Sequence, residues 1–181
     1  MSASPHEGPV LVAGIGNIFL GDDGFGVETV RALKERDLPE GVELQDIGVR
    51  GVHLAYQLLD GYDTLILVDA TQRGGEPGTV YVIEHDVAET DGAQPMPLDG
   101  HRMTPDAVLG LLGTLCAGTG ARPPRRTLVV GCEPDVVEER IGLSPSVSGA
   151  VPQAVRVIEE LLRPEERGGP RHAPASGTLE R

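Results

Sequence analysis

Short runs of consecutive apolar residues alternate along this chain with stretches in which apolar residues recur every three or four positions. The continuous runs predict buried strands, because a strand covered on both faces lacks the polar alternation of a half-exposed one. The run at 64–69 is the clearest, since it is apolar until its last residue. We expect five strands, over residues 9–15, 42–47, 64–69, 79–84 and 127–132.

The periodic stretches between these runs predict helices with one apolar face. Thr104 followed by Pro105 is typical of a helix start, with a capping hydroxyl and then a proline in the first turn. Alternating strands and helices predict one three-layer α/β/α domain with a mostly parallel, twisted, five-stranded sheet. The expected helices cover residues 24–37, 52–59, 104–117 and 148–162.

The composition changes near the end of the 181-residue chain. From residue 164 onward Gly, Pro, Arg and Glu predominate and apolar residues nearly vanish, which is typical of a segment that cannot form a core. We therefore expect a folded domain over 1–163 and a disordered tail over 164–181. The segment 86–100 is expected to be an irregular surface loop.

The charge balance narrows the function classes. Lys and Arg number 15 against 28 Asp and Glu, for a formal net charge of -13, which argues against a nucleic-acid groove or a basic membrane-docking face. No apolar run approaches the ~18 residues of a membrane helix, and residues 1–9 lack the pattern of a secretory signal. We expect a cytoplasmic protein. Two cysteines, Cys116 and Cys132, are too few for a disulfide framework; we expect both to lack a nucleophilic role.

Acidic residues and one histidine follow predicted strands or precede a predicted helix. Asp22 and Asp23 end a glycine-rich segment after the first strand, Asp69 ends the third, and His101 precedes the helix at 104. In open α/β sheets the ligand crevice lies outside the carboxyl ends of the strands. One of Asp22 and Asp23, together with Asp69 and His101, would supply two oxygens and a nitrogen there, a set suited to a divalent transition metal. We expect Asp23 and Asp69 to be exposed at the sheet edge, and Asp22 to face the helix that follows it.

Two other functions suggested by this layout fail on detail. Gly14 and Gly16 begin a dinucleotide fingerprint, but Phe19 stands where its third glycine belongs, and the paired aspartates would repel a pyrophosphate. A phospho-receiver domain needs a lysine at the end of a late strand. Lys34, the only lysine, lies in a predicted helix. The chain also lacks the H-E-x-x-H and G-x-S-x-G motifs of other hydrolases.

Several motifs in order give the chain a family resemblance. Residues 14–26 read G-x-G-N-x-x-x-x-D-D-x-x-G, the third strand ends Val-Asp-Ala, and Pro-Gly-Thr at 77–79 and Gly-x-x-Pro at 131–134 follow. The run at 141–147 before the last helix fits as well. With these motifs the chain resembles the [NiFe]-hydrogenase maturation endopeptidases over about residues 10–162. Members of that family remove a C-terminal extension from the hydrogenase large subunit after nickel insertion.

The resemblance assigns roles residue by residue. Asp23, Asp69 and His101 match the residues that bind nickel, Asp23 and Asp69 are the implied catalytic residues, and Asp22 matches a neighbouring acid of secondary role. Residues 46–51 read D-I-G-V-R-G where many members have D-G-G-T-x-G. Three of these positions persist, so we expect a similar loop path, while the substitutions leave its substrate contacts open.

The resemblance also implies a partner and a metal. The partner is a [NiFe]-hydrogenase large-subunit precursor, and the nickel belongs to that substrate, so the isolated protein is expected to be metal-free or to hold an adventitious cation. Peptide hydrolysis then has two routes. Either the nickel polarises the scissile carbonyl or a water, or a carboxylate such as Asp23 acts as general base. A non-cleaving, metal-dependent hydrogenase assembly factor is the alternative function.

Overall fold

The computed structural model describes residues 8–87 and 104–163. Its five strands form one sheet in the order β2-β1-β3-β5-β4. β1 lies between β2 and β3, β3 pairs with β5, and all of these pairings are parallel, whereas β4 is antiparallel to β5. The predicted α/β class is confirmed. The strands are β1 (Val10–Ile15), β2 (Val42–Gly48), β3 (Thr64–Ala70), β4 (Val80–His85) and β5 (Arg126–Cys132).

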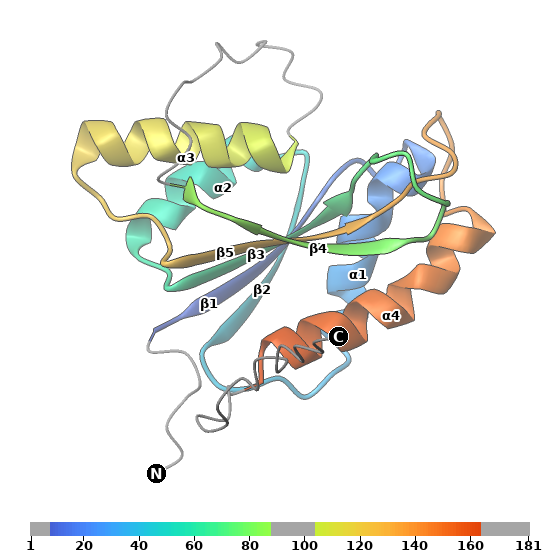
Figure 1. Ribbon diagram of the computed structural model, residues 1–181, viewed down its shortest axis with the longest axis horizontal. Helices are drawn as coiled ribbons and strands as arrows, with labels where there is room; N and C mark the ends of the chain where they lie inside the picture. The colour runs from blue at the N-terminus through green and yellow to red at the C-terminus, as the bar shows by residue number, and fades with distance from the viewer. Residues whose placement is uncertain (1–7, 88–103, 164–181) are drawn as a thin grey trace, which may run out of the picture.

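Helices cover both faces of this sheet (Figure 1). α1 and α4 lie on one face, and α2 and α3 lie together on the other. Two 3-10 turns, η1 (Gly21–Gly24) and η2 (Leu58–Asp60), precede α1 and follow α2. The helices are α1 (Phe25–Leu33), α2 (Gly51–Gln57), α3 (Pro105–Thr119) and α4 (Pro145–Leu161). None of the helices within 8–87 and 104–163 is long and apolar enough to cross a membrane.

The central strand β3 joins two apolar clusters. Ile66 and Val68 pack in the cluster with α1 and α4, while Leu65 and Leu67 pack in the cluster with α2 and α3. Both faces of β3 are therefore buried, which explains why its sequence shows no polar alternation.

Some predicted boundaries are wrong by a few residues. α1 ends at Leu33 rather than at 37, and Pro39 stands in the connection to β2. α4 begins three residues earlier than expected, at Pro145, because Ser144 is its N-cap and the proline occupies the first turn. The predicted tail 164–181 and most of the predicted loop 86–100 lie outside the described residues, so the domain boundary at 163 stays a prediction.

Candidate functional site

Glycine allows the segment after β1 to approach the end of β3. Gly16 has φ +117°, and a Cβ there would lie 2.0 Å from the Asp23 carbonyl oxygen and 3.3 Å from Asp69 Oδ1. A Cβ on Gly26, in the first turn of α1, would lie 2.0 Å from the Val68 carbonyl oxygen. Only residues without a side chain fit at these two positions. The glycine-rich motif therefore brings Asp23 and Asp69 to the same edge of the sheet.

Asp69 is a buried carboxylate at the end of β3. It is 6% exposed, and its Oδ1 has no hydrogen-bond partner among the described residues. Burial, and secondarily the charge of Asp23, raise the pKa of Asp69 well above its ordinary value, against the opposing effect of the Ala70 N–H. The expectation of an exposed side chain here was wrong, because α1 packs directly against this end of β3. Such a carboxylate requires either a proton or a cation.

Asp23 lies in η1 and is half-buried. Its Oδ2 accepts a hydrogen bond from the Asn17 N–H at 2.8 Å, which fixes the carboxylate relative to the β1 end. Asp23, Asn17 and Asp69 all line one cavity of about 730 Å³. The two predicted catalytic residues thus share a single cavity at the carboxyl edge of the parallel strands.

His101, the third predicted ligand, lies outside the described residues, so its convergence with the two aspartates stays a prediction. The structure does describe Thr104 and Pro105, and both line the same cavity. Thr104 caps α3, its Oγ1 accepting from the Ala107 N–H at 3.3 Å, as predicted. Within 8–87 and 104–163, no three His, Cys, Asp or Glu side chains are grouped so as to hold a metal. The described part of the site contributes two carboxylates.

Asp22 does not face α1 as predicted. Its buried carboxylate accepts from the N–H groups of Asp135 and Val136, each at 2.8 Å, and from the N–H and Oγ of Ser144 at 2.7 and 2.8 Å. Burial alone would raise the pKa of Asp22, but these donors outweigh it and the pKa is lowered. Asp22 thus fastens the segment that precedes α4 to the motif that carries Asp23.

Glu133 plays a similar part beside β3 and was not singled out from the sequence. Its carboxylate accepts from the N–H groups of Arg73 and Gly74 at 2.8 and 3.1 Å, and from the Tyr81 hydroxyl at 2.9 Å. The Arg73 guanidinium lies 5.8 Å from the centre of the Tyr81 ring, and Arg73 lines the cavity. Glu133 therefore shapes the loop that follows Asp69. A lone Glu after Cys132 gives no signal of partners some sixty positions away.

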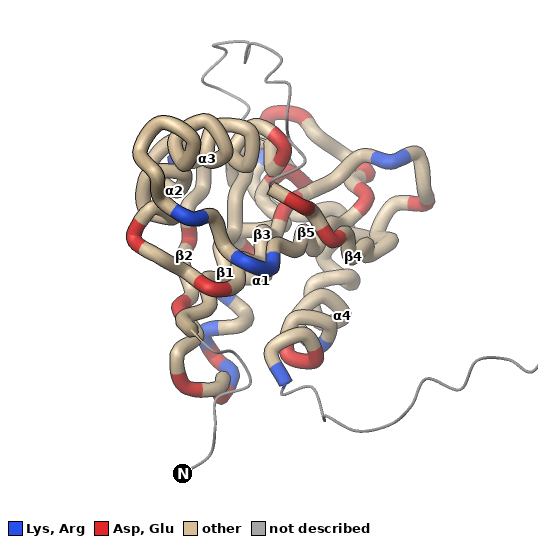
Figure 2. Tube along the Cα trace, turned by 60° about the vertical axis from the view of Figure 1, so that its left-hand side comes forward, with Lys and Arg blue, Asp and Glu red and all other residues tan. Residues whose placement is uncertain are grey.

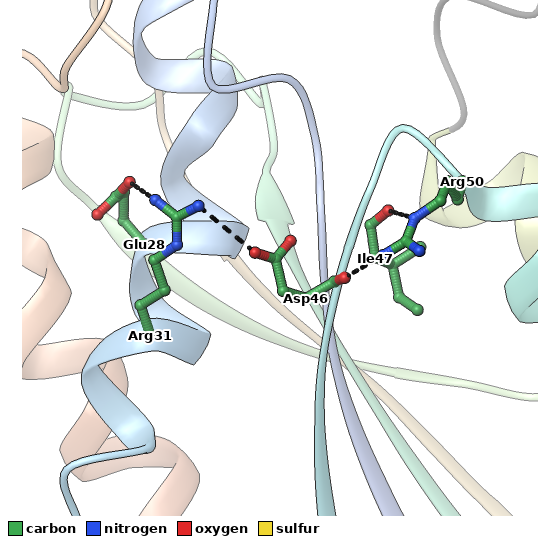
Figure 3. Close-up of polar contacts among 5 residues, drawn as sticks. All are labelled: Glu28, Arg31, Asp46, Ile47 and Arg50. Atoms are coloured by element: carbon green, nitrogen blue, oxygen red, sulfur yellow. Dashed lines mark hydrogen bonds and ion pairs between the residues drawn. The ribbon is translucent and has the colours of Figure 1, made fainter.

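The loop 46–51 bounds the cavity on the β2 side. Gly48 has φ +59° and, with Val49, lines the cavity. The Arg50 side chain donates to the carbonyl oxygens of Ile47 and Asp46, at 3.1 and 2.7 Å. Figure 3 shows the other side of this loop, where the Asp46 carboxylate lies 3.5 Å from the Arg31 guanidinium. Asp46 and Arg50 therefore fix the path of the loop.

Both cysteines are buried, as expected for residues without a nucleophilic role. Burial first, and then the charges of Asp22 and Glu133, raise the pKa of Cys132 to about 11. Burial also raises the pKa of Cys116. A neutral, buried thiol is a poor nucleophile. Neither thiol is therefore suited to nucleophilic attack.

Comparisons with known proteins place the chain in a family. The family model for hydrogenase maturation proteases matches residues 27–161. A hydrogenase expression/formation protein, HupD of Rhizobium leguminosarum bv. viciae, is 38% identical over 162 residues, covering 88% of this chain and 76% of that protein. The hydrogenase 2 maturation protease of Escherichia coli is 34% identical over 158 residues, covering 85% and 90%.

A solved structure shares the fold. The hydrogenase maturating endopeptidase HybD of E. coli superposes with a TM-score of 0.69 at 30% identity, covering 85% of this chain and 91% of that one. Relatives named as proteases favour an enzyme over a non-cleaving assembly factor. The chain belongs to the hydrogenase maturation protease family and is an endopeptidase of that family.

Proposed function

We propose that this protein removes the C-terminal extension of a [NiFe]-hydrogenase large subunit after nickel insertion, and that Asp23, Asp69 and His101 bind the nickel of that substrate. The observation that carries the proposal is the buried Asp69 carboxylate. Its Oδ1 lacks a hydrogen-bond partner among the described residues, and Asp69 lines the same cavity as Asp23. Two carboxylates that line the same cavity repel each other unless one of them holds a proton or a cation lies between them.

The donor chemistry fits a nickel ion that arrives with the substrate. Carboxylate oxygens and an imidazole nitrogen bind divalent transition metals, and two anionic donors offset the charge of the ion. Three protein ligands leave further positions for ligands from the large subunit. A precursor without nickel would leave Asp23 and Asp69 unpaired. The site therefore favours the metal-loaded substrate.

Two routes to hydrolysis are compatible with this site. In both, water adds to the scissile carbonyl carbon, the C–N bond breaks, and the leaving amine gains a proton. In the first, Asp23 accepts the proton of the attacking water, since it is half-buried at the cavity wall and oriented by Asn17. In the second, Asp23 and Asp69 only hold the substrate's nickel, and the charge of that ion polarises the carbonyl.

The test compares nickel-loaded and nickel-free precursor, with mass spectrometry of the large subunit as readout. We expect shortening of the nickel-loaded form alone, and loss of shortening in Asp69→Asn, Asp23→Asn and His101→Ala. Asp23→Glu should keep part of the activity, since glutamate supplies the same carboxylate one methylene farther from the backbone. Glu160→Gln, on the exposed face of α4, is the control for loss of one negative charge.

Equal trimming of nickel-free precursor would contradict the proposal, as would trimming by a variant that lacks both Asp23 and Asp69. Binding of nickel-loaded precursor without any shortening would favour the assembly factor instead. The proposed setting is the cytoplasm, which fractionation of cells that express the full chain tests.

A further inference from the structure

Large apolar side chains remain exposed beside the cavity. Phe19 is 61% exposed, Ile141 is 79% exposed and Val137 is 44% exposed. We call these three residues the apolar rim. Phe19 is one of only two phenylalanines in the chain, and leaving it in water forgoes the free energy of burial that large apolar side chains usually gain.

The rim is continuous with the wall of the cavity. The backbone of residues 19–21 runs beside that of Arg140, because the Arg140 N–H donates to the Phe19 carbonyl at 3.0 Å and the Gly21 N–H donates to the Arg140 carbonyl at 2.9 Å. Leu20 and Arg140 form a parallel bridge. Leu20, next to Phe19, lines the cavity, and so does Val137. A chain that enters the cavity on this side therefore passes the rim.

Hydrogen bonds to Asp22 also fix the backbone segment that carries Val137 and Ile141. Asp22 binds the N–H groups of Asp135 and Val136 and both polar groups of Ser144, so the segment that carries Val137 and Ile141 is fastened at both ends. An apolar surface that is already ordered loses little conformational entropy on binding, so more of the contact free energy appears as affinity.

We propose that the apolar rim docks the folded body of the protein substrate, at an apolar patch beside its scissile segment. This inference rests on the proposed function. Exposed Asp135, Glu138 and Glu139 surround Val137, against one cation in Arg140, so the matching patch carries basic residues at its margin. Acidic segments elsewhere are spread over the described chain (Figure 2). The rim combines exposed apolar side chains with a cluster of acidic residues beside the cavity, whereas Val49, which is 55% exposed and also lines the cavity, lies on the β2 side.

The test measures trimming of the nickel-loaded full-length precursor over a range of precursor concentrations. In the variant Phe19→Ser/Ile141→Ser we expect KM to rise roughly tenfold or more, the loss that follows from two large side chains that no longer become buried, with kcat within about twofold of the unaltered protein, because only binding is affected.

A matched pair of single substitutions provides the control. Val137→Thr and Val82→Thr remove the same apolar group from side chains of similar exposure, 44% and 48%. Val82 alternates on β4 with Ile83, which lines the cavity, so Val82 faces the opposite side of the sheet. We expect KM to rise in Val137→Thr and to stay unchanged in Val82→Thr. This pair decides the question if the double variant fails to fold.

The outcomes separate the two proposals. If the unaltered protein does not trim nickel-loaded precursor, the proposed function fails. If it does, and rim variants keep the same KM, the docking inference is overturned while the function stands. Sedimentation velocity supplies the other test: a dimer of the unaltered protein that becomes monomeric in Phe19→Ser/Ile141→Ser would show that the rim binds a second copy, which also overturns the inference.

Discussion

At the scale of single residues, the Asp69 carboxylate is expected to lower the stability of the fold although the proposed function requires it. A carboxylate buried beside Asp23, with an unpaired Oδ1 within the described structure, lowers the free energy of unfolding, because a charge taken from water needs compensation. Asp69→Asn keeps the shape and removes that charge. We expect trimming to be abolished while the midpoint of thermal unfolding stays the same or rises, by up to about 4 °C for roughly 1 kcal/mol.

Calorimetry of both proteins at neutral pH checks this prediction. The control is Glu160→Gln, which removes an exposed negative charge and should leave both trimming and the midpoint unchanged. A fall in the midpoint of more than about 4 °C in Asp69→Asn would mean that the carboxylate stabilises the fold, and would remove the reason to expect a cation at this position.

The candidate residues were predictable from the sequence to different degrees. Asp23 and Asp69 could be found because each ends or follows a strand, and the carboxyl ends of parallel strands meet at one edge. The role of Asp22 could not, because its partners at Asp135, Val136 and Ser144 are more than a hundred positions away along the chain. The burial of Asp69 was missed because it depends on how α1 packs against the end of β3, which the sequence pattern does not give.

At the scale of elements, Asp22 connects η1 to the N-terminus of α4. Asparagine has the same size, but its amide group places a donor where one carboxylate oxygen accepts. With the NH2 group at the Oδ1 position the Ser144 N–H loses its acceptor, and the bonds to Oδ2 lose the strength that the negative charge gives them. We expect Asp22→Asn to lower the free energy of unfolding by about 3 kcal/mol. Ser144→Ala removes only the hydroxyl bond and should cost about 1 kcal/mol.

Urea unfolding followed by circular dichroism gives both values. The ordering of the two variants is the sharper criterion, because Asp22→Asn also removes the charge that strengthens the remaining bonds, whereas Ser144→Ala removes a single bond. Equal effects, or an Asp22→Asn variant within about 0.5 kcal/mol of the unaltered protein, would mean that the carboxylate does not hold α4 to the first motif.

Glu133 fixes the loop after β3 in a way that depends on pH. The N–H of Arg73, together with the Tyr81 hydroxyl and the N–H of Gly74, lowers the pKa of Glu133 below its ordinary value of 4.5. A carboxyl whose pKa is lower in the folded state stabilises the fold fully above about pH 4.5, and that contribution is lost as the pH falls through the folded-state pKa.

We therefore expect Glu133→Gln to unfold at a lower temperature than the unaltered protein at pH 7, and the difference to shrink between pH 4.5 and pH 3. Thermal unfolding at pH 7, 5, 4 and 3 measures it. Glu84→Gln, an exposed acid on β4, is the control. A difference that stays constant down to pH 3 would show that the loss comes from packing and not from the carboxylate charge.

The elements themselves were largely predictable because their signals are local. Each predicted strand overlaps an observed one within about a residue at either end. The apolar runs of β1, β3 and β5 reflect burial on both faces, whereas β2 and β4 are partly exposed edge strands. The start of α4 was placed late because Val147 and Ala150, the first buried residues of its stripe, follow the cap at Ser144. Strand direction is not local, and the antiparallel pairing of β4 with β5 at the sheet edge was not predicted.

At the scale of the whole molecule, β3 couples the two helical layers to the site. Asp69 ends the strand whose side chains pack alternately into both apolar clusters, so the position of its carboxylate depends on both layers. Asp23 reaches the same cavity from η1, which directly precedes α1. The site thus lies where the two layers and the sheet edge meet, which makes the integrity of the whole fold a condition for activity.

This coupling predicts that the layers unfold together. Ile66 and Leu67 are both fully buried on β3, the first facing α1 and α4 and the second facing α2 and α3. Ile66→Ala and Leu67→Ala should each lower the free energy of unfolding by about 2–5 kcal/mol and keep a single transition. Hydrogen exchange measured by mass spectrometry should then accelerate in α3 and α4 alike in both variants, because either cavity weakens the strand that the layers share. Exchange that accelerates in α4 alone for Ile66→Ala, and in α3 alone for Leu67→Ala, would show that the layers open independently.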